Sequence, residues 1–265
     1  MTIKAYLSVF RMRWKMELQY RGAVIGGVLC QVFFGLVLVS LYHALYASRP
    51  QTLPLESVST YVWLQQAFFR MLLSSDGELA DKVRTGNIAY DLCRPMNLYG
   101  FYYIRILAQK LVGSLLRAAP MLVFAAVLPR GWGVSPPASF PALILSILGL
   151  ALGLACMCAM ENITVGLTMR TLDPKGIQAM LNLLMTFMAG NLLPLTLFPD
   201  GWQKAMTSLP WAQMLDAPIR LYAGQWALLD APRVLLTQGI WTAILALTGM
   251  RLWKANQKRL VVQGG

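Results

Sequence analysis

The chain of 265 residues is 57% hydrophobic and only 13% charged, whereas a soluble domain carries about 25% charged residues. This composition excludes an ordinary soluble protein and indicates a membrane protein. The excess of 23 Lys and Arg over 11 Asp and Glu would also suit a nucleic-acid partner, but these charges flank apolar runs, so we expect a lipid bilayer and no nucleic acid.

Residues 1–21 predict an amphipathic helix at the membrane interface. Large apolar side chains recur there every three or four residues, with lysines and arginines on the flanks. Such a helix lies flat, because its basic side chains reach the headgroups while its apolar side contacts lipid. The sequence leaves open whether this helix only anchors the next segment or also contacts a partner.

Six apolar segments are predicted to span the membrane. The apolar core of a bilayer is about 30 Å thick, which a helix crosses in roughly 20 residues. The second segment fits least well, because it contains Gln65, Gln66 and Arg70. We expect an all-α, polytopic membrane protein that forms a single transmembrane domain over residues 1–265. The expected spans are residues 22–46, 58–75, 104–128, 141–165, 177–198 and 234–253.

The distribution of Lys and Arg predicts how the spans are oriented. Cytoplasmic loops carry the excess of these residues, and most of them fall near the two termini and in the second and fourth connections. We therefore expect both termini in the cytoplasm, a cytoplasmic segment at residues 76–103 and an outer segment at residues 199–233.

The sequence lacks the motifs of several common enzymes. It contains no GxxxxGK[ST] phosphate loop, no GxSxG nucleophile motif and no HExxH pair. His43 is the only histidine and is assigned a structural role, and Cys156 and Cys158 are interpreted as apolar packing residues. We expect no catalytic residue, no metal site and no cofactor bound by this chain. Most acidic residues fall in two segments and are interpreted as solvated surface: Asp76, Glu78, Asp81 and Asp91, then Asp200, Asp216 and Asp230.

Ionisable side chains inside spans are costly and usually face a cavity or a partner. Arg117 lies about 13 residues into its expected span, near mid-membrane by helical rise. It is a candidate for lining a substrate pathway, together with Asn182 and Asn191. The alternative is a structural Arg117 that pairs with a backbone carbonyl or an asparagine. Arg70 and Glu161 lie toward the ends of their spans, which favours snorkelling or a structural ion pair. The possible asparagine partners of Arg117 are Asn162, Asn182 and Asn191.

A charged segment, KVRTGNIAYDLCRPMNLYG at residues 82–100, lies between two apolar runs. The residues just before Gly86 predict a short helix with an apolar edge, and Gly86 suits the C′ position that ends it. Alternating apolar residues after Gly86, followed by Pro95, predict an extended return. Such a row of apolar side chains on a cytoplasmic loop indicates a docking surface for a soluble partner. The row consists of Leu79, Val83, Ile88, Tyr90 and Leu92.

Two stretches of the chain resemble type-two ABC transporter permeases. Residues 78–95 are similar to the coupling segment between the second and third spans of that family. Residues 189–224 resemble the segment after the fifth span, which forms short outer helices. The first similarity is carried by Glu78, Gly86-Asn87-Ile88, Leu92 and Arg94-Pro95, and the second by Gly190, Pro194, Phe198, Pro199, Trp202, Pro210 and Pro218.

The resemblance implies a permease subunit of a bacterial exporter in the plasma membrane. A separate ATP-binding subunit would bind Mg-ATP and receive the helix at residues 78–85 in a cleft, and a second permease, identical or different, would complete the pathway for a small amphipathic substrate. The expected coupling residues are Glu78, Leu79, Lys82, Val83, Gly86, Ile88, Leu92, Arg94 and Pro95.

Other classes of function stay open from the residues alone. A self-sufficient secondary transporter would need acidic residues or histidines inside its spans to bind a coupling ion. Only Glu161 and His43 come near this requirement. A membrane-embedded enzyme or a non-transporting scaffold is the third class. The outer segment is too small to receive a substrate-binding protein, which favours export over uptake.

Overall fold

The computed structural model describes residues 3–48, 53–73, 78, 81–82, 85–93, 96–171, 174–191 and 193–257. Within these residues every regular element is a helix, so the expected all-α class is confirmed. The elements are α1 (Ile3–Gln19), α2 (Arg21–Ser48), α3 (Leu55–Leu72), α5 (Ile88–Leu92), α6 (Leu98–Val127), α7 (Phe140–Thr171), α8 (Pro174–Met188), η1 (Leu195–Leu197), α9 (Asp200–Thr207), α10 (Pro210–Met214), α11 (Asp216–Tyr222), η2 (Leu228–Asp230) and α12 (Ala231–Gln257).

Four of the described helices are long and apolar enough to cross a membrane, namely α2, α6, α7 and α12. The expected second and fifth spans correspond to α3, which has 18 residues, and α8, which has 15. A helix the length of α8 rises about 22 Å, which is less than the apolar core of a bilayer. It ends at Met188, ten residues before the expected end of that span at residue 198, and the positive φ of Gly190 (72°) belongs to the turn that follows. The count of six spans stays a prediction.

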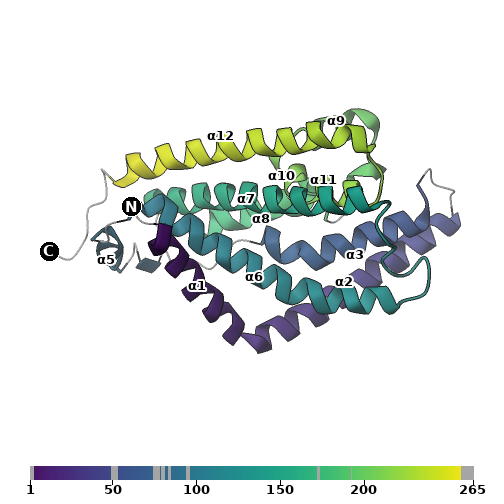
Figure 1. Cartoon of the computed structure of the whole chain (residues 1–265), viewed down its shortest axis with the longest axis horizontal. Coiled ribbons are helices and arrows are strands. Elements are labelled where there is room, and N and C mark those ends of the chain that lie inside the picture. Colours follow the sequence, from purple (N-terminus) through teal and green to yellow (C-terminus); the bar gives the residue numbers. More distant parts are fainter. Residues whose placement is uncertain are drawn as a thin grey trace.

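The long helices run side by side along the long axis of the molecule (Figure 1). α3 packs between α2 and α6, while α7 packs along α12 and α11. The start of α1, the short helix α5 and the end of α12 gather at one end of the bundle, and the connection from α6 to α7 lies at the opposite end (Figure 1). This arrangement places the two terminal helices on the same side as the segment between α3 and α6.

The expected N-terminal helix forms as α1 and packs on α6. Its inner side carries Val9 and Arg13, which are buried, and its outer side exposes Ile3 and Leu7. The chain then turns at Tyr20 and continues directly into α2. We refer to this turn, from α1 through Tyr20 to the first turns of α2, as the elbow.

The connection between α6 and α7 is fixed by side chains of α2 and α3. Trp63 is fully buried and its indole Nε1 donates to the carbonyl of Trp132 at 2.6 Å. His43 Nε2 lies 2.9 Å from the carbonyl oxygen of Gly131, and the imidazole stacks on Trp132 at 4.2 Å. These contacts agree with the structural role expected for His43.

A buried lysine joins three helices at the end of α3. Lys110 of α6 has no solvent exposure, and its Nζ lies 2.6 Å from the carboxylate of Glu161 on α7. The same ammonium donates to the carbonyls of Met71 at 3.0 Å and Leu73 at 2.6 Å, at the end of α3. Carbonyl groups at the end of a helix lack partners within it, so Lys110 satisfies them. The structural ion pair expected for Glu161 is present.

A second polar network connects α3, α11 and the end of α8. Asp216 is fully buried, accepts a hydrogen bond from Tyr61, and pairs with Arg220 at 2.8 Å. Gln65 donates to the Tyr61 hydroxyl at 2.8 Å and to the carbonyl of Ala189 at 2.9 Å. The interpretation of Asp216 as solvated surface is therefore wrong, because the outer segment folds back against α3 and α7 and buries this carboxylate.

Replacing Gly153 of α7 with alanine should destabilise the protein. An added Cβ would lie 2.2 Å from the carbonyl oxygen of Met214, a backbone atom of α10 that cannot move alone. We expect a cost of about 1–3 kcal/mol from overpacking, even though alanine favours a helix over glycine by about 1 kcal/mol. Gly149→Ala is the matched control, because its Cβ would meet Pro218 at an ordinary 3.4 Å. Equal thermal unfolding temperatures for the two variants in detergent would contradict this close approach.

Removing the counterion of Lys110 should destabilise the protein more than removing both charges. Glu161→Gln leaves a buried ammonium without its carboxylate, which costs about 3–5 kcal/mol. Lys110→Met combined with Glu161→Leu removes the charge, although the carbonyls of Met71 and Leu73 then lose their donor. Thermal unfolding should rank wild type first, the double variant second and Glu161→Gln last. A double variant less stable than Glu161→Gln would show that the lost hydrogen bonds to these carbonyls cost more than the unpaired charge.

Candidate functional site

The cytoplasmic segment predicted to couple to a partner is held to the bundle by charged contacts. The carboxylate of Glu78 forms a charge-assisted hydrogen bond with Arg105 of α6. It also lies 3.5 Å from Arg13 of α1 and 3.4 Å from Lys82, one helical turn further along. One carboxylate therefore connects this segment to two separate helices.

A second carboxylate, Asp91 of α5, extends these contacts. Its Oδ2 lies 2.8 Å from Lys82 Nζ and accepts a hydrogen bond of 2.8 Å from the Tyr102 hydroxyl. Asp91 is only 3% exposed, so its interpretation as solvated surface is wrong. The residues Arg13, Glu78, Lys82, Asp91 and Arg105 are called the charged hub below.

The hub holds Glu78 in its ionised form. Burial by itself raises the pKa of this carboxyl, but the hydrogen bond and charge of Arg105, with the charges of Lys82 and Arg13, lower the pKa from 4.5 to about 2. The Arg105 guanidinium also lies 5.5 Å from the ring centres of both Phe101 and Tyr102. These contacts fix its orientation toward Glu78.

The backbone around Gly86 explains how the chain changes direction. Gly86 has a φ of 74°, and the amide of Thr85 donates to the carbonyl of Asp81 at 2.9 Å, which confirms Gly86 as the residue after a helix. The chain then forms the short helix α5, where we expected an extended return. The expectation was wrong because the Gly86 and Asn87 carbonyls accept from the amides of Ala89 and Tyr90 and nucleate a helical turn.

The apolar row of this segment divides between core and surface. Ile88 is 1% exposed and packs in a cluster with side chains of α1, α6, α7 and α12. Tyr90 is 75% exposed and Leu92 is 40% exposed, so these two remain accessible to a partner. Of the other expected coupling residues, Glu78 and Lys82 belong to the charged hub, and Leu79, Val83, Arg94 and Pro95 lie outside the described residues.

Sequence reasoning missed four residues of this region. Asp91 and Tyr102 both fell in the predicted cytoplasmic segment without an assigned partner, and Arg13 and Arg105 looked like ordinary interfacial charges. One signal was present for Arg13, because it falls on the opposite flank of α1 from Lys4, Arg11 and Lys15. A lone charge on that flank indicates a partner on a neighbouring helix.

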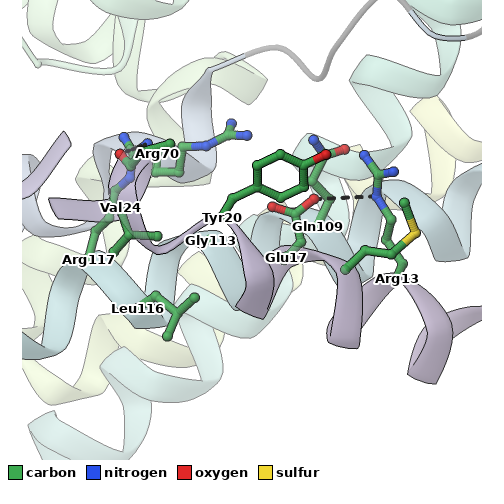
Figure 2. A pocket seen from close by; sticks show the side chains of 11 residues that line it. Arg13, Glu17, Tyr20, Val24, Arg70, Gln109, Gly113, Leu116 and Arg117 are labelled. Atoms are coloured by element: carbon green, nitrogen blue, oxygen red, sulfur yellow. Dashed lines mark hydrogen bonds and ion pairs between the residues drawn. The ribbon is translucent and has the colours of Figure 1, made fainter. Parts of the chain in front are cut away.

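A pocket at the elbow contains Arg117. It has a volume of about 220 Å³, and Figure 2 shows the side chains around it, with Arg13 joined to Glu17 by an ion pair of 3.4 Å. Arg117 Nη2 donates to the carbonyl of Ala23 at 3.4 Å, which is the backbone-carbonyl contact expected as the structural alternative. The lining residues are Arg13, Met16, Glu17, Tyr20, Ala23, Val24, Arg70, Gln109, Gly113, Leu116 and Arg117.

The structure does not bring Arg117 together with the asparagines proposed as its neighbours. Arg117 lies beside the first turns of α2, and its depth in the membrane stays a prediction. Asn162 donates to the carbonyl of Tyr99 at 3.1 Å. The residues that line the elbow pocket come from α1, α2, α3, α6 and the turn at Tyr20, and include neither Asn182 nor Asn191.

Prolines of the outer segment stand at the starts of short helices, as the sequence predicts. Pro194 and Pro199 immediately precede η1 and α9, and Pro210 is the first residue of α10. The ring of Phe198 packs edge-on against Phe187 of α8 at 5.9 Å. Trp202 of α9 is 66% exposed, so it is the accessible aromatic residue of this set.

The contribution of Glu78 to stability should depend on pH in a defined window. Because its pKa falls from 4.5 to about 2 on folding, the stabilisation is fully present above about pH 4.5 and is lost as the pH falls toward about 2. The difference in Tm between wild type and Glu78→Gln in detergent should therefore be constant from about pH 8 to 5 and narrow below that. A difference that grows on acidification would contradict the hub.

Comparison with known families assigns most of the chain to one family. Residues 54–264 match the model of the ABC-2 family transporter protein, so the match includes the described helices from α3 to α12. No curated protein matches the chain closely. Because the match covers well over half of the sequence, the chain belongs to the ABC-2 family of transporter proteins, the membrane components of ATP-binding-cassette transporters.

Proposed function

We propose that this chain is the membrane-spanning permease subunit of an ATP-binding-cassette exporter and depends on a separate subunit for ATP hydrolysis. The observation that carries the proposal is the charged hub. Through Glu78 it connects the segment between α3 and α6 to Arg13 of α1 and Arg105 of α6. A movement imposed on this segment is transmitted directly to two helices, which is what coupling to a partner requires.

The contact with the ATP-binding subunit is proposed at the exposed part of the same segment. Tyr90 and Leu92 are exposed apolar side chains on a helix that lies at the end of the bundle, beyond the long helices (Figure 1). Exposed apolar side chains grouped in this way mark protein interaction sites. Leu79, Val83, Arg94 and Pro95 are proposed to complete this contact, and Mg-ATP is proposed to bind in the partner.

The substrate pathway is proposed to require a second permease, identical or different. α8 exposes Met180, Leu183 and Phe187, and Asn182 and Asn191 are the proposed polar residues of the pathway. A pathway between two bundles is lined mainly by such apolar groups and suits a small amphipathic substrate. We further propose six spans, both termini in the cytoplasm and a bacterial plasma membrane.

The alternative of a self-sufficient secondary transporter is less well supported. It would use an acidic side chain inside the bundle to bind a coupling ion. Glu161 is the candidate, but its carboxylate lies 2.6 Å from the buried ammonium of Lys110. That ion pair already neutralises the charge that a coupling ion would need.

The test introduces charge on the exposed face of α5. Tyr90→Asp combined with Leu92→Asp should abolish co-purification with the co-expressed ATP-binding subunit and stop transport, because desolvating a carboxylate at an apolar contact is costly. Leu229→Asp is the matched control, since Leu229 is 93% exposed and lies in η2, far along the chain. The isolated chain should hydrolyse no ATP. Ion-driven uptake by the reconstituted chain alone, or unchanged co-purification of the α5 variant, would overturn the proposal.

A further inference from the structure

The elbow pocket carries an excess of positive charge. Three arginines line it against a single carboxylate, Glu17. Arg13 pairs with that carboxylate at 3.4 Å and with Glu78 at 3.5 Å. For Arg70 and Arg117, by contrast, the described part of the chain supplies no ion-pair partner. Among these residues, two guanidinium groups are therefore left facing the pocket without a counterion.

The hydrogen-bonding of Arg117 is also incomplete. Its Nε is buried and has no acceptor among the described residues, and its contact with the Ala23 carbonyl is long at 3.4 Å. A buried donor without an acceptor destabilises a fold. An anion in the pocket would supply both the missing acceptor and the missing charge.

The position of the pocket indicates what kind of anion reaches it. It opens at the elbow, where Tyr20 is 63% exposed and the first turns of α2 expose Ile25 and Leu29 to their surroundings. On the other side, the end of α1 next to the elbow exposes Met12, Met16 and Leu18. Aromatic residues and amphipathic helices with such apolar faces lie at the level of lipid headgroups. The pocket is therefore bordered by lipid-facing side chains from both arms of the elbow.

We propose that the elbow pocket binds the phosphate headgroup of an anionic phospholipid through Arg70 and Arg117. Guanidinium groups bind phosphate oxygens in a bidentate geometry, which suits two such groups on one small site. A volume of about 220 Å³ is below the roughly 300–1,000 Å³ of pockets that enclose drug-sized ligands, so it fits a headgroup and not a transported molecule. A bound lipid would join α1 and α2 to α3 and α6. Binding of a lipid headgroup in this pocket does not depend on ATP hydrolysis.

Two neighbouring glycines of α2 provide a matched test. In Gly27→Ala the added Cβ would lie 2.4 Å from Arg117 Cζ and 2.6 Å from its Nη1, so the guanidinium must move out of its position. In Gly26→Ala the added Cβ meets nothing within 4 Å. Both changes place alanine in the same helix and keep every charge, so they differ mainly in where Arg117 points.

The measurement is lipid binding by the purified full-length chain in detergent micelles. Phosphatidylglycerol is titrated against phosphatidylcholine and inorganic phosphate, and binding is followed by native mass spectrometry and by the rise in Tm. We expect wild type and Gly26→Ala to bind phosphatidylglycerol alike, and Gly27→Ala to bind it about tenfold more weakly. Arg117→Gln should show a similar loss, while Arg251→Gln, an exposed arginine of α12, should show none.

Three results would overturn the assignment. Equal affinity of Gly27→Ala and Gly26→Ala for phosphatidylglycerol would show that the position of Arg117 does not matter. Equal binding of phosphatidylcholine would show that the negative charge of the headgroup is not recognised. Binding of inorganic phosphate as tightly as phosphatidylglycerol would show a site for a free anion and not for a lipid.

Discussion

The ammonium group of Lys110 is completely buried, and every bond that water would have made to it is replaced by the protein. Glu161 supplies the charge, and the carbonyls of Met71 and Leu73 supply the remaining acceptors. Because α3, α6 and α7 each contribute one side of this contact, their relative positions are fixed at one point inside the bundle. The same constraint, that polar groups in apolar surroundings must find partners within the protein, governs the other polar contacts of the structure.

The charged hub and the network of Asp216 follow this constraint at other places in the bundle. In the hub, Lys82 bridges the carboxylates of Glu78 and Asp91, so Glu78 and the helix α5 are held together. In the Asp216 network, Tyr61 connects the folded-back outer segment to α3. In both sites, hydrogen bonds and ion pairs fix side chains that come from different helices.

Local patterns in the sequence predicted the features that depend only on neighbouring residues. The amphipathic α1, the apolar long helices, the positive φ of Gly86 and the prolines at the starts of η1, α9 and α10 are of this kind. The burial of Asp216 could not be predicted, because its partner Tyr61 is 155 residues away in the chain. Gln65 made the second span look weak for the same reason, since the sequence does not show that Tyr61 and Ala189 receive its hydrogen bonds.

Short segments were the least predictable part of the candidate site. Three apolar residues in alternation before Pro95 fit a strand, yet five residues of this stretch form α5. Over so few residues the apolar patterns of a helix and of an extended segment differ by only one or two positions. The turn at Gly86 and Asn87 decides between the two conformations. Ile88 then points into the core while Tyr90 remains exposed, a division that alternation alone does not reveal.

Arg13 belongs to both the charged hub and the elbow pocket, since its guanidinium contacts Glu78 in the one and Glu17 in the other. The two sites therefore share a single side chain, which reaches both carboxylates at once through different nitrogens. Coupling free energies between sites are reciprocal. A molecule at the elbow that pulls Arg13 away from Glu78 weakens the contact between these two residues. A partner that pulls Arg13 toward Glu78 weakens the contact between Arg13 and Glu17 by the same free energy. The proposed lipid at the elbow and the proposed partner of the segment between α3 and α6 would therefore be linked through Arg13.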